Sequence, residues 1–164
     1  MYEPYPSSGP PQELPRIGPP YAVLNAVRLM YAGAVLEVLA LIIALVTRGS
    51  LKSAILNRHP NYTSAQLHTA EFARTFPLII GALIAIGLWL WMAWVNGKGR
   101  SWARVVSAVF FGINTVDLLI SFSLVHAAAT LIIGPVIWLV GLAAIVLIFS
   151  KGSGPFYMQP PAQG

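Results

Sequence analysis

The sequence contains no cysteine and few charged side chains, and both features limit the classes of protein to which the chain can belong. Without cysteine there can be no disulfide bond, no thiolate metal site and no lipid attached through sulfur. Charged residues make up only 9% of the chain, whereas a typical soluble domain carries about 25%. With 57% hydrophobic residues, the chain has too little polar surface for water to be its main solvent.

The hydrophobic residues are grouped into four long runs rather than scattered. The runs cover residues 27–47, 76–95, 102–125 and 127–149. At about 1.5 Å per helical residue, each can cross a hydrocarbon core of about 30 Å. A backbone in lipid must satisfy its own hydrogen bonds, so we expect α-helices. The sequence predicts an all-α fold, namely a polytopic membrane protein whose four-transmembrane-helix bundle occupies residues 25–150.

Proline and polar residues are concentrated outside these runs. Seven prolines precede Tyr21, and proline lacks a backbone donor, so residues 1–24 are expected to form a disordered Pro/Tyr-rich tail. Residues 151–164 have a similar composition and are expected to be a short disordered tail. Pro135 lies within the fourth run and predicts a kink there, with a tight turn near His126 before it.

Residues 48–75 form the only sizeable loop between the runs. Pro60 ends a first short helix, and Thr63 with Gln66 matches a capping box for a second one. The second helix is expected to continue into the next run, with Pro77 as a bend. Both pieces are amphipathic, so we expect them to lie on the membrane surface.

Basic and aromatic residues indicate the orientation of the chain. Lys98, Arg100 and Arg104 lie beside two membrane ends, where positive charge favours the cytoplasmic side. Trp94 and Trp102 flank them and are typical of an interfacial aromatic belt. The sequence therefore predicts a plasma-membrane protein with both termini in the cytoplasm, in contact with the lipid bilayer.

Two acids lie inside the hydrophobic runs, Glu37 in the first and Asp117 in the third. A charge at the bilayer centre costs about 2.5–3.5 kcal/mol on insertion scales, so such residues usually face the bundle interior. Asn114, Asp117 and Ser121 share one helical face, and Glu37 and Asn114 are expected at matching depth. The sequence predicts an intramembrane polar cluster of these four residues, with a Glu37–Asn114 hydrogen bond. Its role is either structural or ion-coupling.

Other chemistries have no pattern to support them. No catalytic motif is present, the three histidines are scattered, and the basic residues do not form a nucleic-acid surface. We therefore expect a non-enzymatic protein without a metal, a cofactor, a nucleic-acid partner or an identifiable soluble substrate.

The stretch GLWLWMAWVNGKGRSWARVVSAVFFGINT at residues 87–115 and the loop LKSAILNRHPNYTSAQLHTA at residues 51–70 resemble a family of small, uncharacterised four-helix membrane proteins from actinobacteria. The resemblance implies a bacterial plasma membrane and four spans, and it carries over no activity. Small multidrug-resistance transporters also have an intramembrane glutamate in their first helix, but the likeness here is confined to LEVL around Glu37.

Two hypotheses for function follow. The first is a non-enzymatic interaction or accessory protein of the plasma membrane, which contacts other membrane proteins or further copies of itself. The alternative is a small oligomeric transporter or channel component that uses Glu37 and Asp117.

Overall fold

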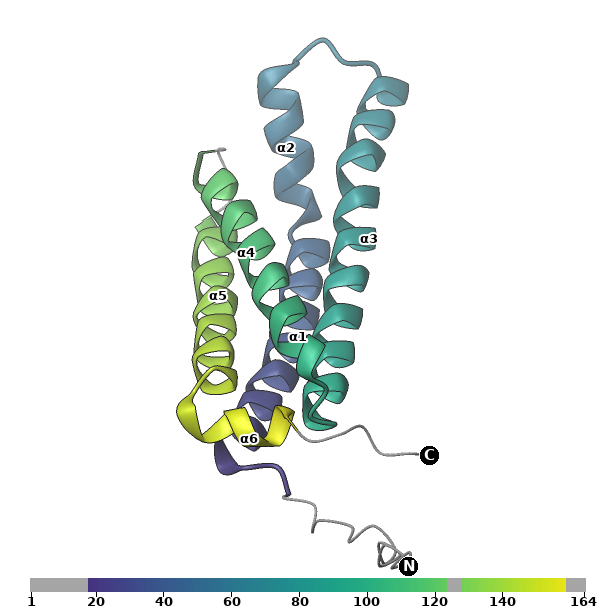
Figure 1. Cartoon of the computed structure of the whole chain (residues 1–164). Helices are drawn as coiled ribbons and strands as arrows, with labels where there is room; N and C mark the ends of the chain where they lie inside the picture. The colour runs from purple at the N-terminus through teal and green to yellow at the C-terminus, as the bar shows by residue number, and fades with distance from the viewer. Residues whose placement is uncertain (1–17, 124–127, 159–164) are drawn as a thin grey trace, which may run out of the picture.

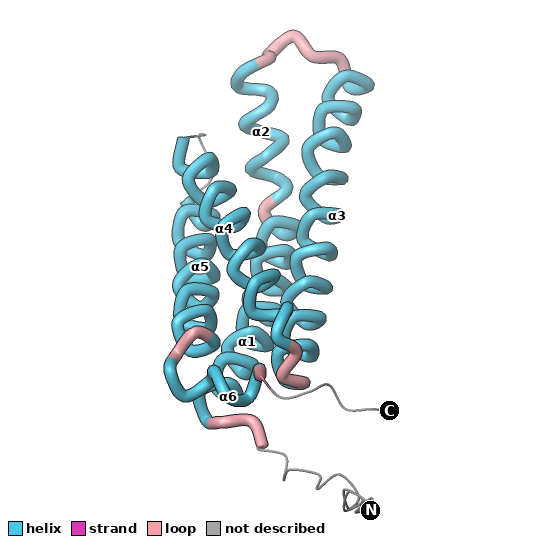
Figure 2. The backbone as a smooth tube through the Cα atoms, in the orientation of Figure 1, coloured by secondary structure: helices cyan, strands magenta, loops and turns pink. Residues whose placement is uncertain are grey.

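The computed structural model describes residues 18–123 and 128–158, without the side chains of residues 48, 50, 51, 54, 121–123 and 128–131. The described part contains helices and no strand (Figures 1 and 2). The elements are α1 (Tyr21–Val46), α2 (Arg48–Arg58), α3 (Ser64–Gly97), α4 (Ser101–Ser123), α5 (Ala128–Ile148), the 3₁₀ helix η1 (Lys151–Ser153) and α6 (Gly154–Tyr157). The predicted all-α bundle is confirmed. The predicted tight turn near His126 and most of the N-terminal tail lie outside the described residues.

Local sequence explains where the long helices begin and end. α1 starts directly after Pro20, because proline cannot donate to a preceding helical turn but suits a helix start. The predicted capping box is confirmed: the Thr63 side chain accepts from the Gln66 backbone, and the Gln66 side chain accepts from the Thr63 backbone. From this cap α3 runs through Pro77 without interruption.

The packing leaves one side of the bundle open. α1 lies between α3 and α5, while α4 packs mainly on α5 and makes few contacts with α3. In Figure 1, α4 begins beside the end of α3 and leans toward α5 at its other end. The Trp138 indole nitrogen on α5 donates to the Thr115 hydroxyl on α4 at 2.9 Å, which fixes this pairing. α3 and α4 therefore diverge from the turn that joins them.

The long helices expose apolar surface rather than bury it. Three of them, α1, α3 and α4, are long and apolar enough to cross a membrane. Only 17%, 17% and 11% of the most apolar 18-residue stretch of each helix is buried. α5 and residues 151–157 are together long and apolar enough to form a fourth span, with a bend of 60° between them. Helices with so much exposed apolar surface need lipid around them. The chain is an integral membrane protein with three or four spans.

The loop expected on the membrane surface has a different geometry. α2 follows α1 after a single residue, Thr47, and pairs with the first part of α3. The resulting α2–α3 hairpin continues along the α1–α3 direction, beyond the ends of α4 and α5 (Figure 1). The 34 residues of α3 extend about 51 Å, far more than the roughly 30 Å of a hydrocarbon core. Helix continuity thus carries this hairpin outward instead of letting it lie flat.

The prediction of a disordered tail over residues 151–164 is wrong for its first part. Residues 151–157 form η1 and α6, and α6 lies across the end of the bundle (Figure 2). Ser153, Phe156 and Tyr157 are buried there. The end of the bundle covers the two aromatic rings, and their burial stabilises the helical structure of this segment. Residues 159–164 lie outside the described part.

Candidate functional site

A cavity of about 380 Å³ lies between α1, α3, α4 and α5. Glu37 lines it from α1, and Asn114 and Asp117 line it from α4. The structure therefore brings three of the four residues of the predicted polar cluster around one space. The side chain of the fourth residue, Ser121, lies outside the described part of the structure. Most other lining residues are apolar: Met30, Gly81, Ile84, Ala85, Leu88, Trp89, Met92, Phe110, Phe111, Ile113, Gly141, Ala144 and Ile145.

Trp89 is the neighbour that determines the surroundings of Glu37. Its indole lies close enough to the Glu37 carboxyl group to interact with it. The indole lies so close to α1 that a Cβ added at Gly33 would be 2.9 Å from three of its carbons. On the other side, the ring comes within 3.4 Å of a Cβ built at Gly141 on α5. Trp89 thus fills the space between α1 and α5 and packs on Gly33, which is one helical turn from Glu37.

The predicted Glu37–Asn114 hydrogen bond is absent among the described residues. The reason is the direction of α4, which packs on α5 and barely contacts α1. Asn114 reaches the cavity but not the opposite wall, where Trp89 already occupies the place beside Glu37. Asp117 lies close enough for its charge to act on Glu37, although its side chain is exposed at the edge of the cavity.

The cavity opens sideways between α3 and α4. Ile84 on α3 and Ile113 on α4 both line it, yet they are 57% and 61% exposed. Lining residues can be this exposed only where the wall is incomplete. Because the two helices diverge here, the opening faces the lipid rather than an aqueous end of the bundle.

A polar cluster of Asn96, Ser107 and Tyr157 lies between the cavity and α6. Asn96 is fully buried near the end of α3, and its amide nitrogen donates to the Met92 carbonyl and the Ser107 hydroxyl, each at 2.9 Å. Its amide oxygen accepts from the Tyr157 hydroxyl on α6 at 3.0 Å. Ser107 also lines the cavity. This Asn96 cluster therefore reaches from the cavity to α6.

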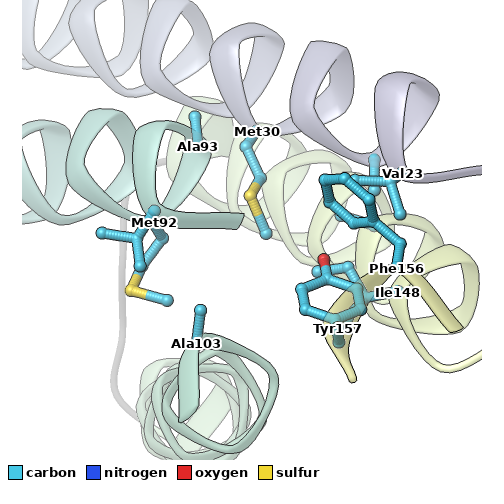
Figure 3. Packing of buried hydrophobic residues seen from close by; sticks show 11 residues of the cluster. Val23, Met30, Met92, Ala93, Ala103, Ile148, Phe156 and Tyr157 are labelled. Atoms are coloured by element: carbon cyan, nitrogen blue, oxygen red, sulfur yellow. The ribbon is translucent and has the colours of Figure 1, made fainter. Parts of the chain in front are cut away.

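An apolar layer surrounds the Asn96 cluster. Met30 and Met92 lie on the cavity side, and Phe156 and Tyr157 of α6 lie on the outer side, together with Ile148 (Figure 3). The Tyr157 hydroxyl acts as a donor within this layer, because it donates to the Asn96 amide oxygen.

The basic and aromatic residues predicted as membrane anchors divide into two groups. Trp94 and Trp102 are exposed, and Lys98 places its ammonium 3.7 Å from the centre of the Trp94 ring, while Arg100 is exposed beside them. Arg104 instead is partly buried, with its guanidinium 4.7 Å from the Phe149 ring centre and 5.1 Å from that of Tyr157. Arg104 therefore packs against the C-terminal segment as well as carrying charge at the membrane end.

The sequence analysis does not single out three residues of the site, namely Trp89, Asn96 and Tyr157. Trp89 lies in the same run as the exposed Trp94, yet it is partly buried and packs against the core. A signal existed, because Ala85, Trp89, Met92 and Asn96 recur at helical spacing and so share one face. Tyr157 carried no comparable signal. Within residues 18–123 and 128–158, no three His, Asp or Glu side chains are placed to hold a metal ion.

No protein-family model, no curated protein and no solved structure matches the chain. The resemblance to small actinobacterial membrane proteins thus stays a prediction, and what is established is a small helical membrane protein with three or four candidate spans.

Proposed function

We propose that this membrane protein binds a hydrophobic cation in the cavity lined by Glu37 and Asp117, as the substrate site of a small transporter or channel component. The observation that carries the proposal is the convergence of two acids from different helices on one mainly apolar cavity. No lysine or arginine is among the described lining residues. A carboxylate in such surroundings is stabilised by a cation, because burial without a partner is costly.

The rest of the lining supports a cation with an apolar body. Trp89, Phe110 and Phe111 line the cavity, and the faces of aromatic rings attract cations. The volume of about 380 Å³ falls within the range of about 300–1,000 Å³ that is usual for small-molecule sites. The opening between α3 and α4 gives direct access from lipid, where a hydrophobic cation accumulates.

Binding is tested with a matched pair of probes in detergent solution. Tetraphenylphosphonium is a hydrophobic cation, and tetraphenylborate is an anion of nearly the same size and shape. We expect the phosphonium to bind and to quench tryptophan fluorescence, because Trp89 lines the cavity. Glu37→Gln should weaken its binding at least tenfold and Asp117→Asn should weaken it less, since Asp117 is at the exposed edge.

The control variant is Glu71→Gln, which removes an acid from α3 outside the cavity and should leave binding unchanged. Equal binding of the cation and the anion, or unchanged affinity in Glu37→Gln, would overturn the proposal. Transport is then measured as proton or phosphonium flux in proteoliposomes, again with the Glu37 and Asp117 variants.

The interaction hypothesis remains a second candidate, and one observation favours it. The α2–α3 hairpin extends beyond the rest of the bundle (Figure 1), and Phe72 on it is 65% exposed and stacked against Phe76 at 5.3 Å between ring centres. An exposed aromatic pair outside the bundle is a surface on which another membrane protein can dock. Failure of every probe to bind in the cavity would leave this candidate in first place.

A further inference from the structure

The C-terminal segment, residues 150–157, is attached to the bundle as a separate small unit. It bends by 60° from α5 and covers the end of the bundle where α3 ends and α1 begins (Figures 1 and 2). The Ser150 and Ser153 hydroxyls both donate to the Leu147 carbonyl at 2.8 Å, which fixes the bend. We call this segment the C-terminal cap.

The cap is docked by a few specific contacts. The Tyr157 hydroxyl donates to the Asn96 amide oxygen on α3 at 3.0 Å. Among the described residues, the other side-chain hydrogen bonds of the cap are made within the cap or to Leu147 on α5. Phe156 rests on the α3–α4 turn at Gly99, where φ is +67° and an added Cβ would be 2.8 Å from the ring. A glycine is needed both for that backbone conformation and for that close approach.

Little separates the cap from the cavity. Met30, Met92 and Ser107 line the cavity, and Asn96 and Tyr157 lie directly behind them. Methionine side chains are unbranched and adapt easily to a changed space. Without the cap, the Asn96 oxygen and the methionine layer would meet water at this end.

We propose that the C-terminal cap is a gate that closes the cavity toward the end of the bundle where α1 begins and α3 ends. The cavity is open to lipid between α3 and α4, and the cap closes its route to water. Movement of the cap breaks one hydrogen bond to α3 and withdraws two aromatic rings, and it leaves the packing of α1, α3 and α5 intact. The meaning of the gate rests on the proposed cation site, whereas closure itself can be measured without any ligand.

The experiment uses the absence of cysteine in the chain. Ala144→Cys places a single thiol in the cavity lining, at a position that is 1% exposed. The protein is reconstituted into liposomes and treated on both faces with sulfonatoethyl methanethiosulfonate, an anionic thiol reagent that does not cross lipid. The rate of labelling then reports water access to the cavity from the ends of the bundle.

Three changes to the cap are compared in this background. Tyr157→Ala removes the ring and the hydroxyl, Tyr157→Phe removes the hydroxyl alone, and Gly99→Ala pushes Phe156 away. We expect labelling at least tenfold faster with Tyr157→Ala and Gly99→Ala, and a smaller increase with Tyr157→Phe. The matched control is Met158→Ala, at a neighbouring residue that is 82% exposed, and its rate should equal that of the parent.

Equal labelling rates in the parent and in all folded cap variants, or rapid labelling of the parent itself, would overturn the gate. Folding is checked by gel filtration and circular dichroism, and Tyr157→Phe provides a mild change if truncation of the ring prevents folding. Phosphonium binding in detergent is measured on the same proteins. Loss of the cation site with retained gating would refute the proposed function and leave the gate standing.

Discussion

Asn96 lies where a membrane helix ends and yet has no contact with water. Both of its amide groups are used: the nitrogen donates to Met92 and Ser107, and the oxygen accepts from Tyr157. A buried amide without such partners would cost several kcal/mol in lipid. The residue is tolerated here because three parts of the chain converge on it.

This arrangement predicts a stability effect that is shared between two side chains. Asn96→Ala and Tyr157→Phe should each lower the free energy of unfolding by about 1–3 kcal/mol, because each leaves a buried polar partner unpaired. The double variant should lose clearly less than the sum, since both changes break the same hydrogen bond. Unfolding is followed by circular dichroism in detergent.

Asn57→Ala is the control for this comparison. Asn57 is an exposed residue on α2, and its replacement should change stability by no more than about 0.5 kcal/mol. Strict additivity of the Asn96 and Tyr157 effects would contradict the shared bond.

At the scale of helices, the pairing of α1 with α3 depends on an aromatic side chain packed on a glycine. Trp89 occupies the space that a side chain at Gly33 would need. The same ring lies beside the Glu37 carboxyl group. The contact between the two helices and the shape of the cavity therefore depend on one another.

Gly33→Ala is expected to disturb both at once. The added methyl group would lie 2.9 Å from the indole, and overpacking of this kind costs about 1–3 kcal/mol. Since Trp89 must move, phosphonium affinity should fall together with the melting temperature.

A glycine on α3 provides the control for this change. Gly87 has nothing within 4 Å of an added Cβ, so Gly87→Ala should leave affinity unchanged and raise stability by up to about 1 kcal/mol through helix propensity. A Gly33→Ala protein with native affinity and melting temperature would show that the ring is not held there.

At the scale of the whole molecule, the two ends of the bundle differ in kind. One end has the α3–α4 turn, the C-terminal cap and the start of α1, and the other has the α2–α3 hairpin (Figure 1). Lys98, Arg100, Arg104 and Lys151 belong to the first end. Positive charge favours the cytoplasmic side, so we expect this end to face the cytoplasm.

Single cysteines test this topology in intact cells. Asn61→Cys on the hairpin should react with a membrane-impermeant maleimide from outside. Lys98→Cys and Lys151→Cys should react only after the cells are opened, because an even number of spans places them on one side.

Each outcome of this test has a distinct meaning. Reaction of both lysine positions from outside, with Asn61 protected, would reverse the orientation. Opposite behaviour of Lys98 and Lys151 would contradict four spans.

Much of the fold was predictable because it depends on local properties of the chain. Hydrophobic runs long enough to cross a bilayer identify spanning helices whatever their neighbours are. The capping box at Thr63 was predictable for the same reason, since its partner Gln66 is three residues away. For the acids, the sequence predicted that both face inward. The structure places both at one cavity, with Glu37 partly buried and Asp117 exposed at its edge.

The remaining features depend on how the helices pack, and sequence spacing alone does not contain that information. Trp89, Trp91 and Trp94 occur within six residues, yet Trp89 points into the bundle while Trp91 and Trp94 are exposed. Which face of α3 turns inward is decided by contact with Gly33 on another helix. The missing Glu37–Asn114 bond has the same origin, because the lean of α4 toward α5 sets that distance.

The sequence by itself determined that the chain lies in a membrane, which segments are long and apolar enough to cross it, and that two acids lie within those segments. The reason is that transfer of a helix into lipid depends on its own side chains, residue by residue. Only the tertiary structure decided that Tyr157 meets Asn96 across 61 positions of sequence and that α6 of the C-terminal cap lies across the end of the bundle. Such contacts depend on the joint packing of distant segments, so no local pattern specifies them.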